Sequence, residues 1–330
     1  MQKQEIKEFV KLILPHGVVK KLESKSLIQE YTPPKLYNDK NQEVFVFYLQ
    51  DNRCAHTPYS FVSGRVPSRI IWDRFNTGLP IQFYSHLNII NQKGQVRNET
   101  KRFGILIESE GICPYEYNFI ISKYDIIQDL DALFTHSERL LNIFPNAKYI
   151  PGGGVWYGTS RHGGKIDDSA FFLKSKNVSI VSSQKAACEL HRFRLELAKT
   201  MLKEGIGDVM GTVVNKYVKI ADSLTDYRYS VAIENFSSAY YFTEKLMNCF
   251  ASMTVPIYYG AKKIDRFFNI DGIIVIEEPT IDCVLKALRN CSESDYLSRK
   301  EAIFDNYQRV KKFLSLEDYI WENYHDEFVL

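Results

Sequence analysis

The chain has 330 residues, of which 45% are apolar and 25% charged, a composition typical of a folded globular protein and not of a disordered or fibrous one. Its 42 basic and 40 acidic residues leave a net charge of +2, too small to attract bulk nucleic acid or an anionic membrane over long range. The length suggests two domains, and a ligand cleft between them is the default expectation.

The N-terminal residues do not have the pattern of an export signal. Ile6, Phe9, Val10 and Ile13 recur at helical spacing between lysines, which predicts an amphipathic helix. No run approaches the ~20 apolar residues of a membrane span. We therefore expect a cytoplasmic protein with at most peripheral contact at the inner face of the membrane. The scattered cysteines, expected to be reduced thiols, are Cys54, Cys113, Cys188, Cys249, Cys283 and Cys291.

The first half of the chain indicates an open α/β domain. Buried strands are predicted at 43–50, 80–84 and 103–108. Residues 131–150 change from a two-residue period to a helical one and back, which predicts a β-α-β unit whose helix starts at the N-cap Ser137.

Glycines then crowd the segment 152–168, which has the least regular pattern in the chain, and we place the domain boundary there. The predicted domains are 1–160 and 161–305. A helical tail follows at 306–330. The sequence leaves open whether residues 314–330 close against the first domain.

A second α/β series follows the boundary, and only helices are predicted after residue 281. Strands that alternate with helices of this length imply a parallel sheet covered on both faces. The predicted strands are 177–183, 207–211, 229–235, 255–260 and 272–278, and the predicted helices are 188–204, 217–224 and 243–253.

Polar residues gather where the strand at 229–235 ends. Glu234 and Asn235 close this strand, and ligands of parallel sheets bind beyond the carboxyl ends of strands. A helix then begins at Thr243, and its unpaired N–H groups offer a partial positive charge to an anion. Lys245 is unfavourable in the first turn of an isolated helix but suits a diphosphate site. The alternative is a solvated helical turn without a ligand.

At this segment the chain resembles the α1,3/α1,4-fucosyltransferase family, glycosyltransferase family 10. Members carry a strand ending in Glu-Asn, then Tyr-x-Thr-Glu-Lys opening a helix, then a strand with Pro and a following Gly. The matching elements here are Glu234-Asn235, Tyr241 to Lys245, and Pro256 to Gly260, in the same order and at the same spacing. The resemblance is close over residues 175–275 and weak before them.

This resemblance implies a GT-B fold, in which two Rossmann-like α/β domains face a cleft. The first domain, 1–160, would bind the acceptor, and the second, 161–305, would bind the donor. The reaction implied is an inverting, metal-independent transfer of L-fucose from GDP-fucose to a glycan hydroxyl. No cofactor is implied. Lys245 would neutralise the donor phosphates and Glu244 would hold the ribose hydroxyls. The donor-binding residues implied are Arg192, Glu234, Asn235, Tyr241, Thr243, Glu244 and Lys245.

Two assignments keep an alternative. The family has an Arg on the first helix of the donor domain, which Arg192 matches, with Arg194 as the second choice. The family's general base is a Glu just after a strand of the first domain, which Glu108 matches, with Glu110 as the second choice.

The remaining motifs give weaker evidence of function. Asp129-Leu130-Asp131 has the form of a metal-binding DxD but lies at a predicted helix-to-strand junction, so we interpret it as a solvated turn. No histidine pair has zinc-ligand spacing. His136 is expected to have a local hydrogen-bonding role. Compared with animal members, the chain suggests a bacterial or viral form that acts on a lipopolysaccharide or other lipid-linked glycan. The competing hypotheses are a same-fold transferase of another nucleotide sugar, a non-catalytic nucleotide-sugar binder and a periplasmic binding protein.

Overall fold

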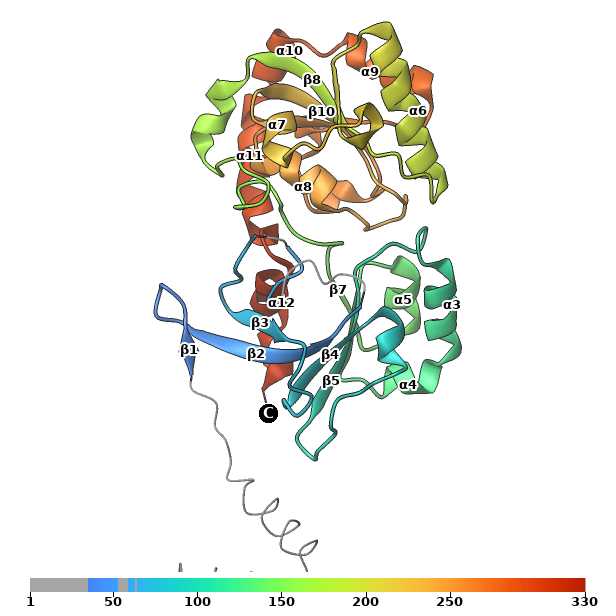
Figure 1. The fold of residues 1–330 in the computed structure, drawn as a ribbon, viewed down its shortest axis with the longest axis vertical. Coiled ribbons are helices and arrows are strands. Elements are labelled where there is room, and N and C mark those ends of the chain that lie inside the picture. The colour runs from blue at the N-terminus through green and yellow to red at the C-terminus, as the bar shows by residue number, and fades with distance from the viewer. Residues whose placement is uncertain (1–34, 53–58, 63, 330) are drawn as a thin grey trace, which may run out of the picture. The chain divides into compact units, whose positions relative to one another are not determined.

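The computed structural model describes residues 35–52, 59–62 and 64–329 (Figure 1). The predicted N-terminal helix around Ile6 and Phe9 lies outside these residues, as does Cys54. Residues Asn38–Leu330 form one compact unit, which the following paragraphs describe.

The first sheet is parallel and has the strand order β2-β4-β5-β6-β7, with β3 also paired to β2. The strands predicted in this half are confirmed, and β3 is an addition that was not predicted. The strands are β1 (Leu36–Tyr37), β2 (Glu43–Gln50), β3 (Ile70–Asp73), β4 (Ile81–Ser85), β5 (Lys101–Leu106), β6 (Ala132–Thr135) and β7 (Ala147–Tyr149).

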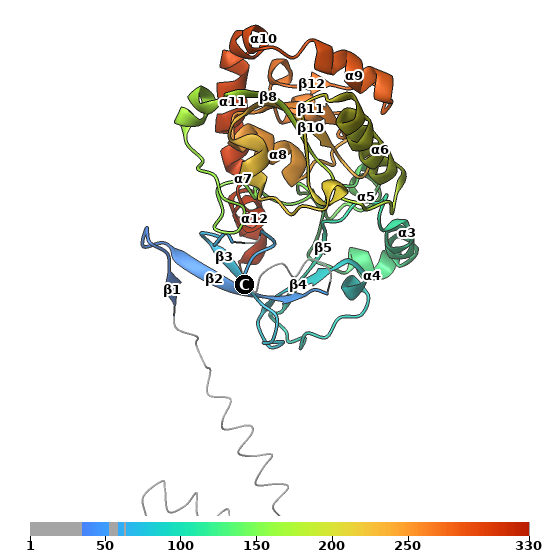
Figure 2. The same ribbon diagram turned by 45° about the horizontal axis from the view of Figure 1, so that its top comes forward.

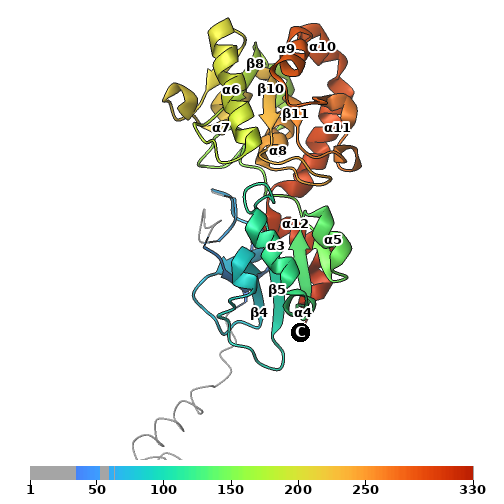
Figure 3. The same cartoon turned by 90° about the vertical axis from the view of Figure 1, so that its right-hand side faces the viewer.

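Helices cover both faces of this sheet because its side chains alternate. On β2, Tyr48 packs with the helices α3, α4 and α5, whereas Phe47 and Leu49 pack on the opposite face, against α12. The predicted N-cap of α5 is confirmed, since the Ser137 hydroxyl accepts the N–H of Leu140. The helices are α3 (Pro114–Ser122), α4 (Tyr124–Gln128) and α5 (Glu138–Ile143), which Figure 3 shows in front of β5.

The second sheet is also parallel, with the order β12-β11-β10-β8-β9. All of its predicted strands are confirmed, although β12 keeps only two of the seven residues predicted for it. The strands are β8 (Lys176–Val181), β9 (Asp208–Met210), β10 (Tyr227–Ile233), β11 (Val255–Tyr259) and β12 (Ile274–Val275).

One face of the second sheet packs with α6, α9 and α10, and the other packs with α7 and α8, an arrangement that can be followed in Figure 2. The helices are α6 (Glu189–Glu204), α7 (Ile220–Leu224), α8 (Glu244–Ala251), α9 (Ile281–Arg289), α10 (Glu293–Ser298), α11 (Lys300–Val310) and α12 (Leu316–Tyr324). Short 3-10 helices are η1 (His86–Ile89), η2 (Asp168–Leu173), η3 (Thr212–Val214), η4 (Ile264–Arg266), η5 (Ile270–Gly272), η6 (Lys311–Phe313) and η7 (His325–Phe328).

The C-terminal tail packs on the first sheet, which answers the question left open by the sequence. Leu316 and Ile320 of α12 are fully buried in the core of that sheet, and the Phe328 ring lies 5.1 Å from that of Phe47. Glu317 is also fully buried, and its carboxylate accepts the Trp72 indole N–H at 2.7 Å. Because the carboxylate also accepts bonds from Ser60 and Phe61, its burial is compensated.

In the described part of the chain, no helix combines the length and the apolar character needed to span a bilayer. The five described cysteines form no disulfide with one another.

Candidate functional site

Three neighbouring strands of the first sheet end in ionisable residues. The residue after β4 is His86, two residues after β5 comes Glu108, and the residue after β6 is His136. Parallel strands bring their carboxyl ends to one edge, so residues far apart in the sequence meet there. Both histidines are buried, and Glu108 is partly exposed.

The second sheet presents Glu234 and Asn235 at the carboxyl end of β10, next to the start of α8. A hydrogen bond joins this edge to the first one, because the Asn235 side-chain amide donates to Glu108 Oε1 at 3.1 Å. The Tyr241 hydroxyl lies 3.5 Å from the same carboxylate oxygen, and its ring packs at 4.5 Å from that of His136. The structure therefore brings the predicted base together with two of the predicted donor residues.

Close backbone approach reinforces this junction. A Cβ atom added at Gly111, in the loop after Glu108, would come within 2.7 Å of the Phe236 ring. Glycine is therefore the residue that lets the two loops touch.

Glu234 is buried at the start of α8. Its side chain is 0% exposed, and its two carboxylate oxygens accept the N–H and the hydroxyl of Thr243 at 2.8 and 2.7 Å. Burial raises the pKa of Glu234, and the ammonium of Lys245 at 3.5 Å opposes this rise. In this arrangement the Glu234 carboxylate supports the start of α8, and its contact with a donor stays a prediction.

Thr243 is confirmed as the N-cap of α8, since its hydroxyl accepts the N–H of Lys245. Its side chain is almost fully buried, so it shapes the helix end and offers little surface to a ligand.

Glu244 and Lys245 are the exposed members of this cluster, with 19% and 24% of their side chains accessible, and they form an ion pair at 2.9 Å. Burial alone would raise the pKa of Glu244, but the charge and hydrogen bond of Lys245 outweigh it and lower this pKa. Burial alone would lower the pKa of Lys245, but the Glu244 and Glu234 carboxylates raise it instead. Both groups are therefore charged at neutral pH and accessible to a polar ligand.

The structure places Arg194, and not Arg192, beside these acids. Arg192 is exposed and donates to the Ala186 carbonyl, away from the cluster. Arg194 is buried, donates to the Ile233 carbonyl at 2.8 Å and is attracted by Glu234 and Glu244. The geometry favours the alternative that the sequence ranked second, because on α6 it is Arg194 that faces the carboxyl end of β10.

His191, one turn earlier on α6, is a neighbour that sequence reasoning missed. Burial, followed by the positive charges of Arg194, Lys245 and Lys185, lowers its pKa to about 4, and the Glu108 charge opposes this shift. A neutral imidazole thus lies among the cations of the site. A lone histidine in a helical pattern gives no signal of this in the sequence.

Glu110, the second candidate for the base, is engaged in local structure. Its carboxylate accepts the hydroxyl of Ser137, the N-cap of α5, and pairs with Arg139 at 2.8 Å. These bonds tie Glu110 to the first turn of α5, so the geometry favours Glu108.

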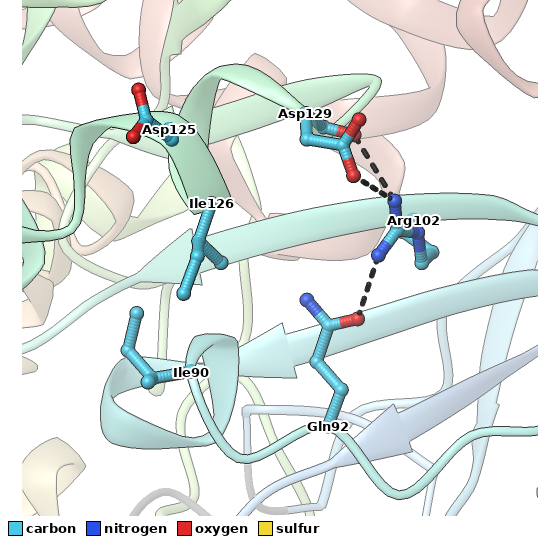
Figure 4. A pocket seen from close by; sticks show the side chains of 6 residues that line it. All are labelled: Ile90, Gln92, Arg102, Asp125, Ile126 and Asp129. Atoms are coloured by element: carbon cyan, nitrogen blue, oxygen red, sulfur yellow. Dashed lines mark hydrogen bonds and ion pairs between the residues drawn. The ribbon is translucent and has the colours of Figure 1, made fainter.

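The DxD-like motif lies at the opposite end of the strands. Asp129 pairs with Arg102 at 2.6 Å, and Figure 4 shows this guanidinium also bonded to Gln92. These residues line a hollow of about 490 Å³ at the start of β5. Because Asp131 accepts the Arg102 backbone N–H at 2.7 Å, both acids have partners, which agrees with a structural turn.

Another group with potential metal ligands lies beneath Glu108. One ligand atom from each of His86, Cys113 and Glu116 falls within 4.8 Å of the others. His86 Nε2, however, accepts the Glu108 backbone N–H at 3.3 Å, which leaves the ring proton on Nδ1, 3.0 Å from Glu116. A protonated Nδ1 cannot coordinate a metal, so the donor set does not fit one in this arrangement.

Comparison with known proteins agrees with this architecture. Residues 173–323 match the model of the family described as glycosyltransferase family 10 (fucosyltransferase), C-terminal part. An α-(1,3)-fucosyltransferase, FucT, from Helicobacter pylori is 26% identical over 113 residues, which cover 34% of this chain and 24% of the relative. The chain thus spans about a quarter of that relative.

Three solved structures share this fold at low sequence identity. An α1,3-fucosyltransferase crystallised with GDP has a TM-score of 0.50 at 16% identity and covers 89% of this chain and 94% of its own. TarM has a TM-score of 0.51 at 14% identity, and the match covers 76% of this chain and 55% of TarM. An α-glucosyltransferase in complex with UDP has a TM-score of 0.53 at 7% identity, and the match covers 88% of this chain and 92% of that structure. The predicted GT-B fold is confirmed.

Proposed function

We propose that this chain, whose residues 173–323 match the C-terminal model of glycosyltransferase family 10, transfers L-fucose from GDP-β-L-fucose to a hydroxyl of a glycan with inversion. One observation carries the proposal: the Glu108 carboxylate on one strand edge is hydrogen-bonded to Asn235 on the other, beside the accessible Lys245. An acid and a cation on facing edges are what an inverting displacement requires.

In this reaction Glu108 removes the proton of the acceptor hydroxyl. The oxygen then forms a bond to the anomeric carbon, and the bond from that carbon to the diphosphate breaks on the opposite face. The proton stays on the Glu108 carboxyl and GDP leaves with the electron pair. An acceptor hydroxyl within hydrogen-bond reach of Glu108 Oε1 would replace the bond that Asn235 now donates.

The leaving diphosphate gains negative charge as the bond breaks. Lys245, Arg194 and the N-terminus of α8 supply fixed positive charge at that place, which supports a metal-independent reaction. Glu244 receives the ribose hydroxyls on its exposed side, Asn235 contacts the donor near the base, and the buried Tyr241 supports the Glu108 carboxylate.

The acceptor proposed is a β-galactosyl or N-acetylhexosamine unit of a lipopolysaccharide or another lipid-linked glycan, reached on the cytoplasmic side of the membrane. A second candidate function is the transfer of another nucleotide-linked sugar. It is favoured by the presence of an α-glucosyltransferase with UDP among the proteins that share the fold.

Calorimetric titration of GDP, GDP-fucose, GDP-mannose and UDP-glucose in EDTA tests these proposals. Binding of GDP and GDP-fucose without metal, lost in Lys245→Ala, is the expected result. A preference for UDP-glucose would favour the second candidate, and binding only after metal is restored would contradict metal independence.

A further inference from the structure

The main chain at Glu108 is held by side chains and not by the sheet. The β5–β6 ladder ends at the pair Leu106 and Thr135, so the backbone of Glu108 lies beyond it. Its N–H donates to His86 Nε2 at 3.3 Å, and its carbonyl accepts the Tyr117 hydroxyl at 2.7 Å. Both polar groups of this peptide therefore depend on partners from other segments.

The His86 contact requires a defined tautomer. Because an N–H group only donates, Nε2 carries the lone pair and Nδ1 carries the proton. Nδ1 lies 3.0 Å from Glu116 Oε2. The backbone of His86 has φ +52, a left-handed conformation that is unfavourable for a residue with a Cβ. This conformation turns the chain at the end of β4 and directs the ring toward Glu108.

Tyr117 has an equally directed arrangement. Its hydroxyl hydrogen is used by the Glu108 carbonyl, so its oxygen is left to accept from His136 Nε2 at 3.3 Å. Glu116 and Tyr117 are consecutive residues of α3, and both are buried. One turn of α3 therefore reaches both polar groups of the Glu108 main chain. Tyr117 bonds its carbonyl directly, and Glu116 reaches its N–H through His86.

We propose that His86, Glu116 and Tyr117 form a clamp that fixes the main chain of Glu108 and so sets the direction of its carboxylate toward the acceptor. The inference rests on the proposed role of Glu108 as the base. These three are positioning residues, because they contact the main chain of Glu108 and not the reacting atoms. The carboxylate itself is left to Asn235, Tyr241 and the Ser109 N–H.

Two substitutions of His86 separate the clamp from general folding. In His86→Asn the side chain is too short to reach Glu108, while Asn tolerates a positive φ better than most residues. In His86→Gln an amide oxygen can still accept the Glu108 N–H, and the backbone strain is similar to that of His. Tyr117→Phe removes the other contact and retains the ring.

Hydrogen–deuterium exchange of the peptide that contains Glu108, read by mass spectrometry, tests the clamp without any substrate. We expect exchange about tenfold faster in His86→Asn and Tyr117→Phe, and close to wild type in His86→Gln. Unchanged exchange in the first two variants would overturn the clamp. Far-UV circular dichroism identifies a variant that has unfolded. Such a variant is set aside, and the exchange rates of the remaining variants then test the clamp.

Kinetics test whether the clamp positions the base. We expect kcat to fall about 10- to 100-fold in His86→Asn and Tyr117→Phe, with recovery in His86→Gln and an unchanged Kd for GDP. Faster exchange with an unchanged kcat would overturn the positioning role. Absence of fucosyl transfer by the wild-type chain would instead contradict the proposed function, and exchange would still decide whether the clamp exists.

Discussion

The two strand edges of the site are built in different ways. The donor edge comes from one short segment, Glu234 to Lys245, in which the strand end, the N-cap and the ion pair follow each other along the chain. The base edge is assembled from segments around residues 86, 108, 117 and 136. A contiguous site leaves a motif in the sequence, whereas a dispersed site depends on the topology of the sheet.

The largest effect is expected from a substitution of Glu108, the proposed base. Glu108→Gln removes the proton acceptor and keeps the shape, so kcat should fall about 10³-fold. Because no phosphate contact is touched, the Kd for GDP measured by calorimetry should stay the same. The matched control is Glu110→Gln, which loses a local ion pair only. Equal losses in both variants would refute the assignment of Glu108.

A change at the donor edge should give the opposite pattern. Lys245→Ala removes the accessible ammonium and leaves Glu244 without its 2.9 Å partner. The affinity for GDP should fall about 100-fold, as expected for a charge-assisted bond to phosphate. The exposed Lys312 provides a control, since Lys312→Ala removes the same charge elsewhere. Similar GDP affinity in Lys245→Ala and wild type would mean that the contiguous motif does not bind the donor.

A smaller effect distinguishes the two arginines of α6. Arg194→Gln should weaken GDP binding about tenfold, because this guanidinium lies beside Glu234 and Glu244. Arg192→Gln should change it little, since its side chain is exposed and bonded to the Ala186 carbonyl. Calorimetry of both variants, with thermal melts to follow stability, checks the order. The reverse order would restore the assignment made from the sequence.

The smallest effect is a pH dependence that both edges share. Burial lowers the pKa of His136 to about 4, and the pKa of His191 is lowered to the same value. A histidine with a lowered folded pKa contributes stability that is present above pH 6.5 and is lost as the pH falls toward 4. Each should cost about 1 kcal/mol of unfolding free energy between pH 6 and 5.

Urea unfolding at these two pH values measures this loss. The slope of the unfolding free energy against pH should be smaller in His136→Gln than in the wild type, and also smaller in His191→Gln, because each variant loses one of the two histidines. An unaltered slope in both variants would assign the pH dependence to other groups.

The sequence predicted most of the regular structure and the donor edge. Strand 43–50 and the N-caps Ser137 and Thr243 are confirmed because hydrophobic period and capping chemistry are local signals. The helix α3 was not predicted, because its apolar residues do not form a clear stripe. The choice between Arg192 and Arg194 depended on which face of α6 meets β10, a tertiary property.

The base edge was predicted only through Glu108. Its support by His86 could not be predicted, since a histidine at positive φ has no signature of the kind that glycine or asparagine gives. Glu116 and Tyr117 have the sequence pattern of ordinary helix residues. Their proposed positioning role depends on the alignment of β4, β5 and β6, which places His86, Glu108 and His136 side by side.

The packing of α12 on the first sheet has a consequence for biosynthesis. On the ribosome, strands β2 to β7 emerge long before Leu316, Ile320 and Phe328, which complete one face of their core. Until then that face, which includes Phe47, is open to water, and such surfaces favour association with chaperones or with other nascent chains. The first sheet thus emerges first but must wait for the last helix before its folding is complete.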